Sequence, residues 1–110
     1  MTKRKADLLQ GTLDLMVLKT LRQGPLHGWS ISKRIRETSN GVLEIRQGSL
    51  YPALYRLEDK GWIAGRHGVS PEGRKVKLYR LTRSGGKQLA TERATWATFS
   101  AAVNHVLEAT

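Results

Sequence analysis

The spacing of apolar residues in this chain changes after Lys60-Gly61, and that change restricts the folds open to it. Before this point, apolar residues recur three and four positions apart, which is the period of an amphipathic helix. After it, residues 62–64 and 76–81 alternate with a period near two and flank the turn-forming sequence Ser70-Pro71-Glu72-Gly73. The pattern predicts helices followed by a β-hairpin, which is the element order of a winged helix-turn-helix.

The first predicted helix is apolar on more than one side. Gly24-Pro25 ends it, which gives a helix of about a dozen residues. The face at helical spacing consists of Leu9, Leu13, Met16, Val17 and Leu21. Because Leu8, Leu15 and Leu18 widen the apolar surface beyond this face, we expect the helix to contact a second subunit, through Leu8 and Leu9, as well as its own core.

A second, basic amphipathic helix follows the tight turn at residues 26–28 and ends near Ser39-Asn40-Gly41. Its apolar residues are Trp29, Ile31 and Ile35, and its basic residues are Lys33, Arg34 and Arg36. Residues 42–45 then alternate like a short β-strand. This piece is expected to lead directly into the next helix.

Residues 48–58 predict a short third helix with one core face and one free face. Leu50, Ala53, Leu54 and Leu57 fall on one stripe, whereas Tyr51, Pro52, Tyr55 and Arg56 point away from it. Because proline is tolerated best near a helix start, the N-cap is placed between residues 49 and 51, with Ser49 as the best cap. A helix whose N-terminal turns are free suits entry into a DNA groove, and we interpret it as a recognition helix.

Charge divides the chain into two parts. The net charge is +10, which favours nucleic acid or another acidic partner. Residues 1–83 hold 17 of the 19 basic and 7 of the 9 acidic residues, while residues 84–110 are neutral. We therefore predict a DNA-binding winged helix-turn-helix domain over residues 1–83 and a separate function for residues 84–110.

The candidate DNA contacts lie on the second helix, the third helix and the hairpin. They are Lys33; Ser49, Tyr51, Pro52, Tyr55 and Arg56; and Arg74, Lys75 and Lys77. The hairpin cations are expected to meet phosphates and the third helix to meet bases, sugar or phosphate. Three alternatives stay open: the two tyrosines pack against a neighbour, Arg56 pairs with Glu58 or Asp59, and Lys3-Arg4-Lys5 is a solvated face instead of a phosphate-contacting arm.

A last helix begins at Thr82, which is a good N-cap, and carries an apolar seam. The seam repeats at seven and consists of Leu89, Trp96, Phe99, Val103 and Val106, with Glu92 interrupting it. Such a neutral, apolar helix suits dimerisation and not DNA contact. The predicted fold is α+β, mostly α: a winged helix-turn-helix with a C-terminal dimerisation helix.

Several short motifs occur together in order along nearly the whole chain. They are Leu9-Gln10-Gly11-Thr12-Leu13-Asp14, Gly24-Pro25-Leu26-His27-Gly28-Trp29, residues 48–54 with Arg56-Leu57-Glu58, Gly61-Trp62-Ile63, and Tyr79-Arg80-Leu81-Thr82 with Gly85. In these motifs the chain resembles the PadR family of bacterial transcriptional regulators, in its short branch with a single C-terminal helix. It departs from the family at Trp29 and Trp62, where many relatives have tyrosine and leucine, and at Gly86 in the last helix.

The resemblance implies a homodimeric winged-helix repressor that leaves a palindromic operator when a small aromatic or transport-related compound binds near the dimer interface. We hypothesise that Trp96, with Phe99 and Met16, lines a cavity for a flat aromatic effector. The alternative is that Trp96 only fills the dimer core, as large aromatic residues at helical spacing usually do. A further alternative for the whole chain is a winged-helix adaptor that binds proteins without specific DNA binding.

Composition argues against other classes of function. The chain has no cysteine, and its histidines, His27, His67 and His105, lie far apart without a ligand at metal-site spacing. No nucleophile with an ordered base is recognisable, so we expect no catalytic residue, no metal and no cofactor. No apolar run approaches the roughly 18 residues of a membrane span, and we expect a cytoplasmic protein without a membrane partner.

Overall fold

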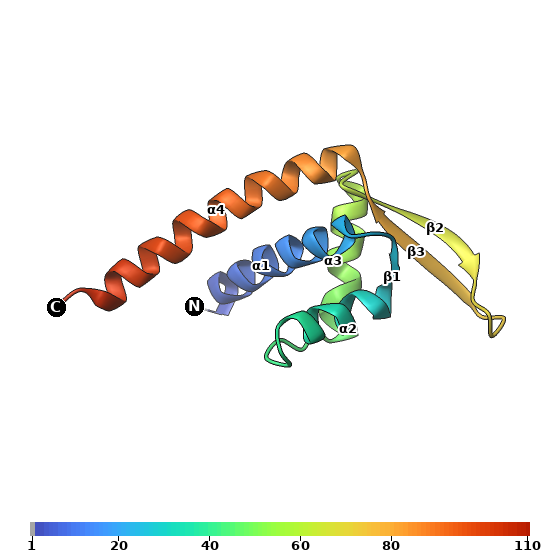
Figure 1. Ribbon diagram of the computed structural model, residues 1–110, viewed down its shortest axis with the longest axis horizontal. Helices are drawn as coiled ribbons and strands as arrows, with labels where there is room; N and C mark the ends of the chain where they lie inside the picture. The colour runs from blue at the N-terminus through green and yellow to red at the C-terminus, as the bar shows by residue number, and fades with distance from the viewer. Residues whose placement is uncertain (1) are drawn as a thin grey trace.

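The protein is described by a computed structural model that covers the backbone of residues 2–110 and the side chains of residues 11–110. Its elements follow in the order α1 (Thr2–Arg22), β1 (Leu26–His27), α2 (Gly28–Thr38), α3 (Gln47–Asp59), β2 (Ile63–Val69), β3 (Lys75–Leu81) and α4 (Arg83–Glu108) (Figure 1). The fold is a winged helix, mostly α, in which the β2–β3 hairpin forms the wing and α4 packs against α1.

One apolar core joins the three first helices, the sheet and the first turns of α4. Its buried members are Leu13, Val17, Leu18, Leu21, Ile31, Ile35, Leu50, Ala53, Leu54, Leu57, Ile63, Tyr79 and Leu89. The predicted inner stripe of the third helix is confirmed, because each of its four residues is at most 1% exposed. The core therefore fixes which face of α3 remains available to a partner.

Helix α1 is 21 residues long, not about a dozen. The spacing of apolar residues predicts a helix only from its first apolar residue onward. Residues 2–8 extend the helix because they are rich in good helix formers such as lysine, arginine and alanine. The side chains of residues 1–10 lie outside the described part of the chain. The predictions for Leu8, Leu9 and Lys3-Arg4-Lys5 therefore stay predictions.

The sheet contains a strand that the sequence pattern missed. The two-residue strand β1 pairs antiparallel with β3, placing Leu26 opposite Tyr79, so that β3 is central in the order β1-β3-β2. A strand of two residues has no measurable period, which is why it was read as a turn. The β-like expectation for residues 42–45 is wrong: Val42 is 80% exposed and its N–H donates to the carbonyl of Ser39, closing a turn after α2.

Helix α3 begins earlier than predicted, and Ser49 does not cap it. The N-cap is Arg46, which makes no side-chain capping hydrogen bond, and Pro52 lies inside the helix. Proline in a helix interior costs roughly 3 kcal/mol. Burial of Leu50, Leu54 and Leu57 contributes about 1.5–3 kcal/mol for each side chain, which outweighs that cost. The hydroxyl group of Ser49 is consequently not used as a cap, and Ser49 is exposed.

Helix α4 begins as predicted at the Thr82 cap, whose Oγ1 accepts the N–H of Gly85 at 3.0 Å. Gly85 is required there, because a Cβ atom at this position would collide with the carbonyl of Trp62. Beyond Leu89 most residues of the helix are exposed, although its middle turns still line grooves against α1, and the molecule is 59 Å long but only 28 and 26 Å wide (Figure 1). Among the residues whose side chains are described, those of α4 after Leu89 are mostly exposed.

Candidate nucleic-acid interface

The outer face of α3 is exposed at three of the five positions where the sequence predicted DNA contacts. Ser49 and Pro52 are exposed, and Tyr55 is 68% exposed although it is a large aromatic residue. Tyr51 differs from them, because it is half-buried and packs against the start of α2. A Cβ atom on Gly28 would lie 2.8 Å from the Tyr51 hydroxyl oxygen, so this glycine makes room for the ring.

Arg56 does not pair with Glu58 or Asp59; its partner is Asp14 of α1. Arg56 Nη2 lies 2.9 Å from Asp14 Oδ1, and the side chains are 31% and 13% exposed. Burial raises the pKa of Asp14, and the neighbouring guanidinium group offsets part of the rise. The pair ties α3 to α1 across 42 positions of sequence, a separation that no local pattern reveals.

The wing ends in a tight turn that presents cations. Ser70 donates its N–H to the carbonyl of Arg74 at 2.8 Å, and the Ser70 hydroxyl oxygen accepts the Arg74 N–H at 3.1 Å. Gly73 has a φ of +82°, a conformation that favours glycine. Arg74 and Lys75 are exposed next to this turn, and neither belongs to an ion pair among the described residues. This confirms the predicted turn and leaves two cations accessible.

Lys77 was predicted to lie at the hairpin tip with them, but it lies lower on the wing and is engaged. Its Nζ is 2.8 Å from Glu58 Oε1, at the C-terminal end of α3. The hydrogen bond to Glu58 raises the pKa of Lys77. An ion pair with side chains 26% and 29% exposed contributes about 1 kcal/mol or less to stability, so its main effect is geometric. Its cation also neutralises the charge of Glu58.

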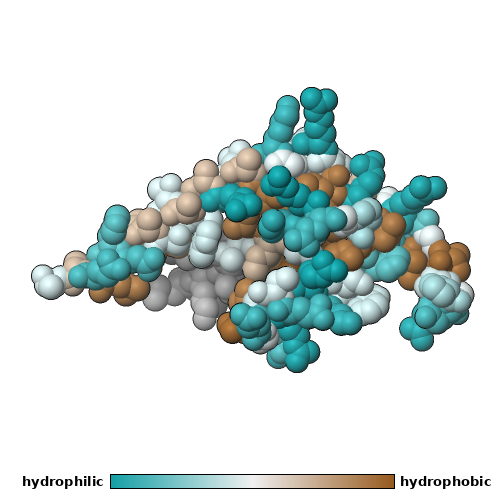
Figure 2. Space-filling view, viewed as in Figure 1, coloured by the Kyte–Doolittle hydropathy of each residue, from teal (hydrophilic) through white to brown (hydrophobic). Residues whose placement is uncertain are grey.

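Lys33 lies on the exposed side of α2 beside an unusually exposed tryptophan. Its Nζ is 5.8 Å from the ring centre of Trp29, which is 55% exposed. Hydrophilic side chains project from the wing in the space-filling view (Figure 2). The accessible cations of Lys33, Arg74 and Lys75 are therefore spread over α2 and the wing.

The apolar seam of α4 divides between the core and the surface. Leu89 is 1% exposed and belongs to the core of its own chain, so its assignment to a dimer interface is wrong. Trp96, Phe99 and Val103 are 40–46% exposed, and Val106 is 74% exposed. Figure 2 shows apolar surface near the C-terminal end of this helix. Leu107, 75% exposed, extends the surface and was missed because it does not fit the repeat of seven.

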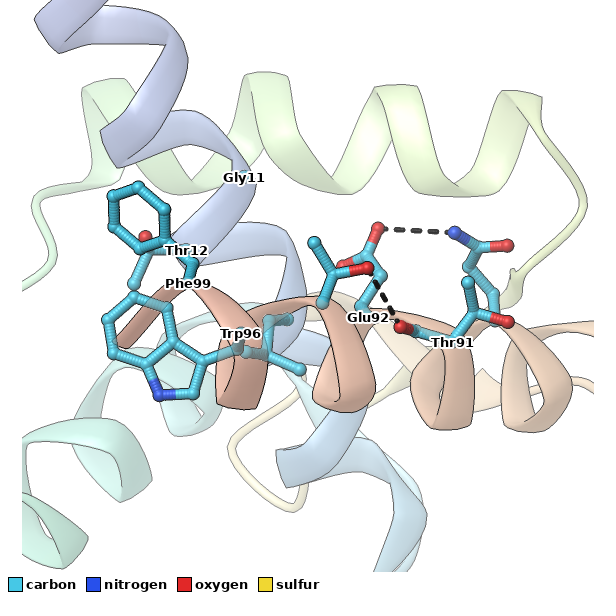
Figure 3. Close-up of a pocket in the computed structure, with 9 residues that line it drawn as sticks. Gly11, Thr12, Thr91, Glu92, Trp96 and Phe99 are labelled. Carbon is cyan, nitrogen blue, oxygen red and sulfur yellow. Dashed lines mark hydrogen bonds between the residues drawn. The ribbon is translucent and has the colours of Figure 1, made fainter. Parts of the chain in front are cut away.

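Trp96 separates two grooves. The first, of about 390 Å³, lies between α1 and α4, and Trp96 and Phe99 form one end of it with ring centres 6.1 Å apart (Figure 3). Met16 lines the second, of about 360 Å³, on the α2 side of Trp96. The three residues predicted for an effector site therefore do not share one groove.

The first groove contains a carboxylate oxygen that has no hydrogen-bond partner among the described residues. Glu92 Oε1 accepts a hydrogen bond from Gln88 at 3.3 Å, whereas its Oε2 is buried without one. A carboxylate oxygen withdrawn from water is costly unless a donor reaches it. This residue, which only interrupted the seam in the sequence, is thus a feature that the groove would present to a ligand.

The histidines do not form a site. His27 occupies the N-cap position of α2 but makes no side-chain capping bond, and His67 is exposed on the wing. Among the described residues no group of histidine and acidic side chains is placed to hold a metal ion. In the same part of the chain, no helix has the length and apolar character needed to cross a membrane.

Several known proteins of similar sequence or structure are described as regulators of transcription. The chain is 31% identical over 77 residues to the negative transcriptional regulator PadR of Bacillus subtilis, covering 70% of this chain and 42% of that protein. A transcriptional regulator from Clostridium thermocellum superposes with a TM-score of 0.82 at 29% identity, covering 90% of this chain and 96% of that one. A PadR-like transcriptional regulator from Bacillus cereus gives 0.76 at 28% identity, with 94% and 99% covered.

The family resemblance seen in the sequence motifs is therefore confirmed. Residues 17–91 match the transcriptional regulator PadR-like family, which is more than half of the chain. Proteins of this family are transcriptional regulators and not enzymes. The chain belongs to the PadR-like family of transcriptional regulators.

Proposed function

We propose that this regulator is a sequence-specific DNA-binding repressor that acts as a homodimer on a palindromic operator. The observation that carries the proposal is the contrast between the two faces of α3. Its inner stripe is at most 1% exposed, while Ser49, Pro52 and Tyr55 on its outer face are exposed. The repressor role rests on the B. subtilis relative, which is a negative regulator.

The outer face of α3 and the wing have different parts in this proposal. Ser49 and Tyr55 lie on the helix that enters the major groove, where a hydroxyl group and an aromatic ring can meet base edges or a thymine methyl group. Arg74 and Lys75 meet phosphates, which contributes affinity for any sequence. Arg56 is left out of the contact set because Asp14 already holds its guanidinium group.

The dimer is proposed from the uncovered seam of α4. Trp96, Phe99, Val103 and Val106 leave large apolar areas in water, and a second copy of the same helix would bury them. A two-fold axis through this seam would place two recognition helices on successive major grooves, about 34 Å apart. The extended shape of one chain is consistent with that separation.

Selection of bound sequences from random DNA, followed by affinity measurements at several salt concentrations, tests the DNA part of the proposal. Arg74→Ala and Lys75→Ala should weaken operator and random DNA alike and lower the salt slope by roughly one unit for each lost phosphate contact. Ser49→Ala and Tyr55→Ala should weaken the operator more than random DNA. Lys87→Ala, which removes an exposed cation from α4, is the control and should change neither.

Two results would contradict the proposal. If all four substitutions lower the affinity for operator and random DNA equally, α3 does not recognise the operator sequence in the proposed way. Capture of a single protein partner, with no preferred DNA sequence, would instead support an adaptor.

The proposed repressor is released by a small aromatic effector in the groove beside Trp96. Stacking on Trp96 and Phe99 would bury a flat ring. Because Glu92 Oε2 lacks a partner there, a ligand that donates a hydrogen bond should bind better than a matched ligand that cannot. Met16 would be reached only by a ligand that passes to the other side of Trp96.

Tryptophan fluorescence against a panel of planar aromatic compounds tests this site. In Trp96→Leu, which keeps an apolar residue in the seam, both quenching and operator release should be lost while the dimer persists. If quenching and release are unchanged in this variant, Trp96 is structural and the sensing site lies elsewhere.

A further inference from the structure

The wing is packed against the protein body near its base and is exposed further out. On β2, Ile63 to Gly65 are buried or half-buried, whereas residues 66–69 are exposed. On β3 the change from exposed to half-buried occurs at Val76 and Lys77. Residues 66–75, which we call the wing tip, therefore extend beyond the last contacts with the body.

Glu58 is placed at this boundary and contacts both strands. Its Oε1 lies 2.8 Å from Lys77 Nζ on β3, and its Oε2 accepts the N–H of Gly65 on β2 at 3.2 Å. Because Glu58 lies in the last turn of α3, one carboxylate joins the recognition helix to the two strands of the wing. Elsewhere, Thr82 Oγ1 and Ser84 Oγ donate to the carbonyl of Gly61, and these bonds hold only the root of the hairpin.

The third member of this arrangement is Gly65, which leaves the space that the ion pair occupies. A Cβ atom there would lie 2.9 Å from Glu58 Oε2 and would also collide with the side chain of Lys77. A residue with a side chain at this position would push the carboxylate or the lysine away. Glu58, Gly65 and Lys77 therefore meet at the point where the wing leaves the protein body.

We propose that Glu58 is a positioning residue for DNA binding: with Gly65 and Lys77 it sets the orientation of the wing relative to the recognition helix, so that Arg74 and Lys75 reach phosphates while α3 occupies the groove. The inference rests on the proposed function, because it concerns the orientation of α3 and the wing tip, the two parts proposed to contact DNA. It assigns no DNA contact to Glu58 itself.

The direction of the effect separates this role from simple electrostatics. Removing a carboxylate from a DNA-binding surface should by itself strengthen the attraction to a polyanion. Loss of a positioning contact should instead weaken binding, because the wing tip no longer meets its phosphates while α3 is bound. Glu58→Ala therefore has opposite expected signs under the two explanations.

The test combines Glu58→Ala with a wing tip that lacks its cations. Operator affinity and its salt slope are measured for wild type, Glu58→Ala, the double variant Arg74→Ala/Lys75→Ala, and the triple variant. Glu58→Ala is expected to weaken operator binding and to lower the salt slope by roughly one to two units, as up to two phosphate contacts are lost. In the Arg74→Ala/Lys75→Ala background, Glu58→Ala should cost no further affinity, because the phosphate contacts that Glu58 would position are already absent and the effects are therefore not additive.

A conservative variant keeps the test interpretable if alanine impairs folding, which circular dichroism and thermal unfolding would reveal. Glu58→Gln retains an oxygen for the Gly65 N–H and loses the ion pair, so it should show a smaller loss with the same dependence on the wing-tip cations. Tighter binding, unchanged binding, or an equal loss in both backgrounds would overturn the positioning role. If Arg74→Ala/Lys75→Ala alone leaves operator binding unchanged, the proposed wing contact itself fails; if that double variant weakens binding and the Glu58 variants do not, only the positioning role fails.

Discussion

The two halves of α4 have apolar residues at similar spacing but different surroundings. In the first turns, Gly85 and Leu89 are buried against the body of the same chain. In the distal half, residues 93–108, Trp96, Phe99 and Val103 continue the seam but remain 40–46% exposed. Helical spacing therefore shows that a face is apolar, and only the fold shows which part of that face is buried and which part remains exposed.

The largest difference between the halves is expected in the stability of the monomer. Leu89→Ala removes a fully buried side chain and should lower the free energy of unfolding by about 2–5 kcal/mol. Val103→Ser, on the distal half, should leave the free energy of unfolding of the monomer nearly unchanged and should weaken the proposed dimer. Urea unfolding at low protein concentration, with sedimentation at micromolar concentration, measures both effects.

The comparison fails if the distal half is part of the monomer fold. An equal loss of stability in Leu89→Ala and Val103→Ser would show this. If the wild-type chain sediments as a monomer at micromolar concentration, the distal seam is not buried in a dimer.

A smaller effect is expected from the polar contact inside the body that joins α1 to α3. Arg56→Ala leaves the Asp14 carboxylate largely withdrawn from water without its partner, and we expect a loss of about 1–3 kcal/mol. Asp14→Asn removes the charge that burial opposes and should cost less. If Asp14→Asn lowers the free energy of unfolding as much as Arg56→Ala does, the attraction between the two charged groups outweighs the cost of burying the carboxylate.

The same pair gives a pH dependence whose sign follows from burial. Burial raises the pKa of Asp14 above its ordinary value of 3.8, so the folded chain binds this proton more readily than the unfolded chain. Its contribution to the free energy of unfolding is fully present below pH 3.8 and is lost as the pH rises through the raised pKa. Asp14→Asn should remove this component from stability measured against pH, and an unchanged profile would argue against it.

The sequence predicted those features that depend on neighbouring residues. The α3 core stripe, the Thr82 cap and the turn at residues 70–73 all follow from local spacing or local hydrogen bonding. The features it missed depend on residues far apart in the chain. Arg56 pairs with Asp14 across 42 positions and Lys77 with Glu58 across 19, so each was assigned to DNA because local spacing does not show these partners.

The burial of Leu89 and the early start of α3 were missed for a related reason. A repeat of seven places Leu89 in line with Trp96, and only tertiary packing assigns it to the core. Local proline preference placed the helix start near Ser49, whereas the helix begins at Gln47 and contains Pro52 in its interior. Local rules thus gave the elements, and the long-range contacts decided which polar and apolar residues remain accessible.

Hydroxyl-radical footprinting of the selected operator, with wild type and Phe99→Ser side by side, tests the central proposal most directly. A dimer held by the distal half of α4, with α3 in each half-site, should protect two patches about 34 Å apart, one helical turn of DNA. Phe99→Ser should lose both patches together at the protein concentration where wild type protects them fully. A single protected patch with wild type, or two patches unchanged in Phe99→Ser, would contradict the account.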